Sequence, residues 1–129
     1  MMNKMTLTIP AKPEWALVLR MTASGVGAVF DLPLDVMDDL KTALDESCEL
    51  LMHQPYCVKS LTLMCAADKD GLRVTLSAQR CDEKQEEEPA DADVAGLIIG
   101  TLVKEVRLSR DEGGVCGVDM LLPARTHGC

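Results

Sequence analysis

The spacing of apolar residues along the chain predicts a short strand followed by two helices. Met5 to Ile9 alternates apolar and polar positions, as a half-buried strand does. From Pro13 to about Phe30 apolar residues recur every three or four positions, which predicts a helix with a wide apolar face. A second helix is predicted to begin at Asp35, a suitable N-cap, and to end before Pro55. Its predicted core stripe comprises Val36, Leu40, Ala43, Leu44, Ser47 and Leu51.

The rest of the chain predicts two hairpins separated by a third helix. Val58 to Ala66 and Leu72 to Ala78 are β-rich, and the Asp70-Gly71 pair between them favours a tight hairpin turn. The run Cys81 to Asp93 holds seven acids and one lysine, which is typical of a solvated loop. The remaining predicted elements are a helix over Val94 to Lys104 and strands over Glu105 to Ser109 and Val115 to Leu122.

This order of elements predicts an α+β fold. The fold class we expect is a two-layer sandwich, with helices on one face of a mixed, mostly antiparallel sheet. Residues 1–122 are expected to form a single domain, with 123–129 as a frayed tail.

Composition narrows the classes of partner. The chain has one Trp, one Tyr and one Phe, so the core must be aliphatic and an aromatic platform for bases is not expected. Acidic residues number 21 against 13 Lys and Arg, for a formal charge of -8. Nucleic acids and anionic membranes both attract positive charge, so neither is an expected partner. A protein with a basic or amphipathic surface fits better.

Cysteine usage and the first residues predict a cytoplasmic protein. No signal peptide or long apolar span is recognisable in the sequence. The six cysteines lack a CxxC pair and any zinc-type spacing, so no metal site is expected. We expect six reduced, mostly buried thiols that pack as small hydrophobic side chains.

Three stretches resemble a known family. They are Ile9-Pro10-Ala11-Lys12-Pro13-Glu14-Trp15, Asp39-Leu40-Lys41-Thr42-Ala43-Leu44-Asp45-Glu46-Ser47-Cys48 and Thr101-Leu102-Val103-Lys104-Glu105-Val106-Arg107. Together they resemble the anti-sigma factors that are also serine kinases, a branch of the histidine-kinase-like ATPases with the Bergerat fold. The resemblance is densest from Ile9 to Tyr56, and it implies ATP and magnesium as ligands of an active member.

The resemblance also implies where a nucleotide would be held, and those positions have changed. The family's general-base Glu falls on Glu46, but the Asn that holds magnesium, one turn later, falls on Leu50. A leucine offers no oxygen ligand to a hard cation. The family's Asp-x-Gly motif for adenine falls on the stretch holding Ala78 and Gln79, which has neither Asp nor Gly.

The third change concerns the phosphates. The family's glycine-rich lid falls on Glu86-Glu87-Glu88-Pro89-Ala90-Asp91-Ala92-Asp93, which lacks glycine and would repel a triphosphate. The three changes favour a protein without kinase activity and without a cofactor. Glu46 is then a residual polar residue of the helix.

The leading hypothesis is therefore a non-catalytic regulator that acts by binding proteins. By resemblance its partner is a sigma factor or an anti-anti-sigma protein, Arg20 lies at a partner-contacting position, and a homodimer is expected. Arg20 as an ordinary solvated residue is an equal alternative. The open alternatives for function are an active ATP-dependent serine kinase and a small-molecule sensor whose pocket is lined by Leu50 and Ala78.

Overall fold

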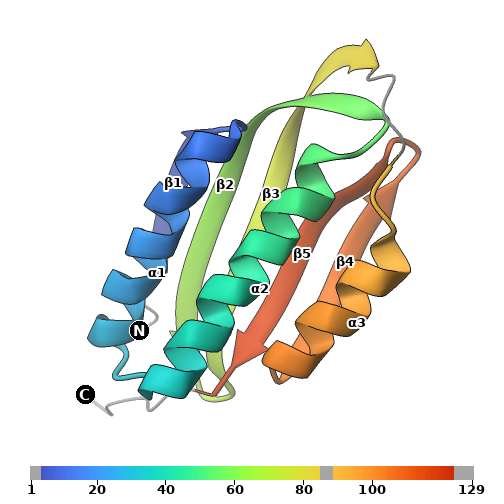
Figure 1. Cartoon of the computed structure of the whole chain (residues 1–129). Coiled ribbons are helices and arrows are strands. Elements are labelled where there is room, and N and C mark those ends of the chain that lie inside the picture. Colours follow the sequence, from blue (N-terminus) through green and yellow to red (C-terminus); the bar gives the residue numbers. More distant parts are fainter. Residues whose placement is uncertain (1–3, 85–88, 124–129) are drawn as a thin grey trace.

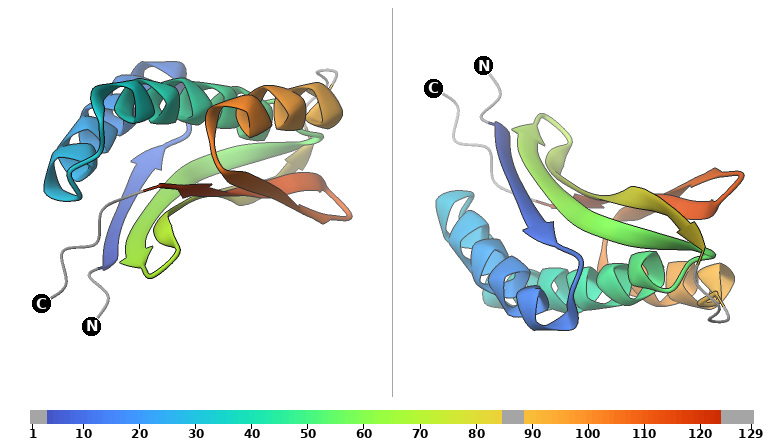
Figure 2. Two further views of the ribbon diagram at one scale, coloured as in Figure 1. Left: turned by 90° about the horizontal axis from the view of Figure 1, so that it is seen from below. Right: turned by 90° about the horizontal axis from the view of Figure 1, so that it is seen from above.

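The computed structural model describes residues 4–84 and 89–123. Within these residues three helices cover one face of a five-stranded sheet, so the chain forms two layers (Figures 1 and 2). The elements are β1 (Lys4–Pro10), η1 (Pro13–Trp15), α1 (Ala16–Val29), α2 (Leu34–Met52), β2 (Tyr56–Asp68), β3 (Gly71–Lys84), α3 (Ala92–Leu102), β4 (Glu105–Asp111) and β5 (Gly114–Leu122). The predicted α+β fold class is confirmed.

The sheet is simpler than the sequence predicted. Its strand order is β1-β2-β3-β5-β4, and every pairing among the described strands is antiparallel. The expectation of a mixed sheet is therefore corrected to an antiparallel one. The reason lies in the connections: β2–β3 and β4–β5 are tight hairpins, and α3 returns the chain so that β5 pairs antiparallel with β3.

The core between the two layers is aliphatic, as the composition implied. Alternate residues of β2 and β3 face the helices, among them Leu61, Leu63, Val74 and Leu76, each at most 1% exposed. Trp15 contributes little, since it is 39% exposed. The largest fully buried side chains are Leu19, Leu40, Leu44, Leu50, Leu51, Leu61, Leu63, Leu72, Leu76, Ile99, Met120 and Leu122.

Two predicted boundaries are wrong. Asp35 is not the N-cap of α2: Pro33 holds that position without a side-chain cap, and Asp35 lies in the first turn. The acidic run is not all loop either, because β3 continues to Lys84 and the Asp91 carboxylate caps α3 by accepting from the Asp93 and Val94 amides. The predicted lid residues Glu86 to Glu88 lie outside the described residues.

The thiols are only partly as predicted. The five cysteines within the described residues are all free. Cys48 and Cys65 are buried, but three others, Cys57, Cys81 and Cys116, are half-buried because they lie near strand ends rather than under the helices. Cys129 lies outside the described residues.

Candidate functional site

The side of α2 that faces α3 carries the position of the family's general base. On the opposite side of α2, Met37 packs close to Gly27 and Asp45 meets Arg20, so that side faces α1. Helical spacing then directs Glu46 toward α3. Glu46 is half-buried, and its side chain makes no hydrogen bond or ion pair within residues 4–84 and 89–123.

One turn further on, Leu50 belongs to the core. It is 1% exposed and packs within the main apolar cluster. Its backbone carbonyl accepts a hydrogen bond of 2.7 Å from Nε2 of Gln54. This position therefore presents no oxygen ligand from its side chain. Among the described residues, no three His, Cys, Asp or Glu side chains are grouped to hold a metal ion.

The two candidate adenine positions lie on opposite faces of β3. The Gln79 amide oxygen accepts from Ser60 at 2.9 Å and from Thr62 at 3.0 Å, on the exposed face away from the helices. Ala78 pairs with Leu61 and packs against the core beneath the helices. Only Ala78 therefore faces the layer in which a nucleotide would lie, and its methyl group cannot accept a hydrogen bond.

Arg80 is the residue that sequence reasoning missed. Strand alternation puts it on the same side of β3 as Ala78. Its Nη2 donates to the carbonyl oxygens of Gly114 and Val115, each at 3.2 Å, and its Nη1 donates to Asp111. The side chain is only 17% exposed. One signal in the sequence could have identified it. Arg80 continues the alternate apolar positions Val74, Leu76 and Ala78 of the strand, and a charged side chain on the core-facing side of a sheet needs hydrogen-bond partners.

The C-terminal end of α2 is bound to the same hairpin. Gln54 is buried, and its Oε1 accepts from the Val115 amide at 2.9 Å. Gln54 and Arg80 together engage both backbone groups of Val115. The ends of α2, β3 and the β4–β5 hairpin are therefore joined by hydrogen bonds at the stretch on which the family's Asp-x-Gly motif falls.

An open pocket of about 450 Å³ lies beside this network. Its lining residues are Tyr56, Arg80, Cys81, Asp82, Asp111, Glu112 and Gly113. The hydrogen bond from Arg80 holds the pKa of Asp111 below its usual range, with the Gly113 amide as a second cause. The guanidinium is already engaged by this carboxylate and by backbone oxygens. Asp82 and Glu112 add further negative charge, so the pocket disfavours phosphate groups.

Arg20 lies at the surface of α1. Its guanidinium is about half exposed, and its Nε approaches Oδ2 of Asp45 on α2 at 3.8 Å. At this distance and exposure the ion pair is weak. Arg20 is therefore available to a partner at little cost.

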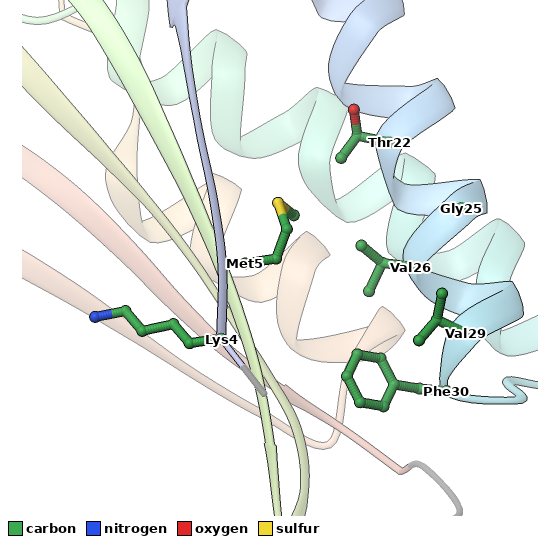
Figure 3. A pocket seen from close by; sticks show the side chains of 7 residues that line it. All are labelled: Lys4, Met5, Thr22, Gly25, Val26, Val29 and Phe30. Carbon is green, nitrogen blue, oxygen red and sulfur yellow. The ribbon is translucent and has the colours of Figure 1, made fainter. Parts of the chain in front are cut away.

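The outward side of α1 is apolar. Leu17, Met21 and Val29 are each more than 60% exposed, and helical spacing puts them on one side together with Gly25. An apolar pocket of about 450 Å³ lies between α1 and β1. Figure 3 shows Met5 of β1, Val26 and Val29 of α1 and Phe30 at the C-cap of α1 around this space, with the Lys4 amine extending away from it.

No family model matches the chain. Comparison with curated proteins finds serine-protein kinases named RsbW. The one from Bacillus mycoides is 24% identical over 128 residues, covering 86% of this chain and 80% of the relative. The one from Listeria monocytogenes is 28% identical over 131 residues, covering 88% and 83%.

A solved structure shares the fold. It contains the RsbU and RsbW domains of a Mycobacterium tuberculosis protein, and it superposes with a TM-score of 0.72 at 17% identity. The match covers 95% of this chain but only 32% of that longer one. At this identity the likeness shows the fold alone.

These findings agree on what the chain is similar to. Its two-layer arrangement is the fold of the solved structure that contains an RsbW domain. In sequence, the chain is similar to the serine-protein kinases named RsbW over most of its length, as the sequence motifs indicated. In the part of the chain that the structure describes, no helix is long and apolar enough to cross a membrane.

Proposed function

We propose that this protein is a non-catalytic, anti-sigma-like regulator that acts in the cytoplasm by binding proteins rather than by phosphorylating them. One observation carries the proposal. Arg80 stands where the family has its adenine-binding motif, and its guanidinium is bound to Asp111 and to the hairpin backbone. A nucleotide base would have to displace this network and would meet Ala78 in place of an acceptor.

The other nucleotide contacts support the same proposal. The magnesium position is Leu50, which is packed in the core. Losing a hydrogen bond to a charged group costs roughly 1.5–3 kcal/mol, and micromolar binding amounts to about 8 kcal/mol in total. Loss of the metal ligand, the adenine acceptor and the phosphate-binding glycines would together remove most of that affinity.

Calorimetric titration with Mg-ATP tests this proposal. We expect no binding at millimolar nucleotide. We also expect none after Leu50→Asn, because the adenine and phosphate contacts are still absent. Micromolar binding to the unmodified protein that Glu46→Ala abolishes would contradict the proposal.

A second candidate is an active serine kinase with an altered site. Two observations favour it: the relatives are named serine-protein kinases, and Glu46 is directed toward α3 without a partner among the described residues. The same titration separates the two candidates. The sensor hypothesis has less support, because Leu50 is packed in the core rather than lining an open pocket.

The proposed partner is a sigma factor or an anti-anti-sigma protein, as the resemblance implies, and not a nucleic acid or a membrane. Arg20 is the proposed contact, since its only ion pair among the described residues is the weak one with Asp45. If Arg20 is a paired interface anchor, Arg20→Ala should weaken binding by about 1–3 kcal/mol. Asp45→Asn is the matched control, because it removes the intramolecular pair and leaves Arg20 in place. Equal affinity of Arg20→Ala and the wild type would assign Arg20 to the solvated surface.

A homodimer is part of the proposal, with the outward side of α1 as its interface. Exposed Leu17, Met21 and Val29 form an apolar stripe interrupted by Gly25, next to the pocket of Figure 3. Large exposed apolar patches mark interaction sites. A two-fold axis would set the knobs Leu17 and Met21 of each copy against the small residue Gly25 of the other.

A further inference from the structure

A second exposed apolar stripe lies on α3. Val94 is 50% exposed, Leu97 73% and Ile98 39%, while Ala95 and Ile99 of the same helix face the core. Positions i, i+3 and i+4 share one side of a helix, so the three exposed residues are neighbours. A surface helix ordinarily turns polar residues to water. On α3 the core side and the solvent side are both apolar.

Acidic side chains border this stripe. Helix α2 runs beside α3 (Figures 1 and 2), and its α3-facing side carries Asp39 and Glu46, with Glu49 exposed nearby. The N-terminal turn of α3 adds Asp91 and Asp93. We define the α2–α3 face as Val94, Leu97 and Ile98 together with these five acids.

Four of these five carboxylates are poorly neutralised within the described residues; the fifth, Asp91, is the N-cap of α3 and accepts from the Asp93 and Val94 amides. Asp39 and Glu46 have no ion pair there. Glu49 approaches Nε2 of His53 at 3.2 Å, which is an ion pair only when the imidazole is protonated. Asp93 meets Arg110 at 3.7 Å through side chains that are both more than half exposed, so this pair is weak.

We propose that the α2–α3 face docks an amphipathic helix of another protein, with apolar residues toward α3 and Lys or Arg toward α2. An apolar stripe on a helix pair is the surface that helix-in-groove recognition uses. The acidic border selects the sign of the flanking charge and steers the approach of a basic partner.

Two other occupants fit less well. A second copy of this chain would bring the same five acids against themselves, and like charges across an interface are costly. An anionic membrane would repel both the face and the chain, whose formal charge is -8. The proposal does not rest on the anti-sigma assignment. The face also lies across α2 from the outward side of α1, so both surfaces can be occupied together.

The probe is a fluorescein-labelled 18-residue peptide, with Leu at helical spacing on one side and Lys along its flank, followed by fluorescence anisotropy. We expect saturable binding that weakens as salt rises. A peptide with Glu in place of Lys should not bind, and neither should a scrambled sequence of the same composition. A weak peptide complex has a dissociation constant on the order of 100 μM. Absence of binding at about 100 μM protein would therefore overturn the proposal, as would equal binding of the Glu peptide.

Matched variants locate the binding. Leu97→Ser should weaken the Lys peptide about tenfold, whereas Leu17→Ser, on the comparably exposed stripe of α1, should leave it unchanged. The pair Asp39→Asn and Glu49→Gln should weaken it several-fold, and Glu14→Gln, at an exposed acid of η1 next to α1, should not. Circular dichroism checks that each variant is folded. If Leu97→Ser binds like the wild type, or Leu17→Ser loses as much, the assignment to this face is wrong.

Discussion

At the scale of single residues, Arg80 differs most from what its neighbours in sequence suggest. It lies two residues after Ala78, where β3 begins to leave the core. Its side chain is nevertheless only 17% exposed, and its guanidinium contacts three oxygens of the β4–β5 hairpin. Its Nε is buried without a hydrogen-bond partner among the described residues. This arrangement makes Arg80 both a link between strands and an obstacle to a nucleotide.

Replacing Arg80 should therefore lower stability. Arg80→Ala removes two hydrogen bonds to backbone carbonyls that are left facing a gap, so we expect a loss of about 1–3 kcal/mol in the free energy of unfolding. Arg107→Ala, an exposed arginine of β4, is the matched control and should change stability by less than about 0.5 kcal/mol. Urea unfolding measures both. Equal effects of the two variants would show that the Arg80 network adds no stability.

The same network predicts a pH dependence in acid. Arg80 lowers the pKa of Asp111, so the folded state favours the ionised carboxylate more than the unfolded state does. That stabilisation is present above the ordinary aspartate pKa of about 3.9 and is lost as the pH falls through the lowered folded value. Arg80→Ala should therefore lose less stability on acidification than the wild type. A parallel fall in both proteins would contradict this account.

Thiol reactivity should divide the cysteines into two groups. Burial raises the pKa of Cys48 to about 12, with Asp45 and Glu49 as further causes, and burial raises that of Cys65 to about 11. The thiolate is the reactive form, so both should be alkylated more slowly than half-buried Cys57 in the folded protein. Timed alkylation with peptide mass spectrometry measures this. Rates should become equal in denaturant. Early labelling of Cys48 in folded protein would be evidence against the packing described.

At the scale of elements, the two tight hairpins and the three helices are well predicted by local pattern. The Asp-Gly turn signal and alternating residues identified β2 and β3, and their observed pairing is antiparallel as expected. The ends were less predictable. Local charge suggested a loop from Cys81, whereas pairing with β2 extends β3 to Lys84.

Two glycines should respond oppositely to the same substitution. Gly114 has φ +104°, and a Cβ there would strike the Gln54 side chain that holds the Val115 amide. Gly114→Ala should therefore destabilise the fold by more than about 1 kcal/mol. Gly25 is an exposed residue within α1 with open space around its Cβ position in the single chain. In the Met21→Asp variant, in which the proposed α1 interface is broken, Gly25→Ala should therefore stabilise by about 0.5–1 kcal/mol. Thermal unfolding compares the two, and a stabilising Gly114→Ala would contradict the hairpin geometry.

At the scale of the whole molecule, the helix layer exposes two apolar stripes separated by an acidic helix. A monomer rarely leaves such stripes uncovered. We infer that residues 1–122 fold as one domain around a single aliphatic core. We also infer that the outer surface of the helix layer, rather than the core beneath it, is where this protein acts.

The proposed dimer is testable at this scale. We expect a dimer by light scattering coupled to size exclusion, and Met21→Asp should shift it to monomer by placing a charge in the apolar α1 interface. Leu97→Asp is the matched control, since it places the same charge on the exposed stripe of α3 and should leave the dimer intact. A weak dimer has a dissociation constant on the order of 100 μM. If the wild type is monomeric at about that concentration, the homodimer is excluded.

The sequence alone was sufficient for the fold class, the order of elements, the aliphatic core and the resemblance to the anti-sigma serine kinases, because periodicity and motif spacing are local properties of the chain. It also located Glu46, Leu50 and Ala78 as positions of interest. Only the tertiary structure showed that Ala78 faces the helices and Gln79 the opposite side of the sheet, because neighbouring residues of a strand point to opposite faces. The Arg80 network was likewise decided by tertiary structure, because its partners lie more than thirty residues away and come close only when β3 pairs with β5.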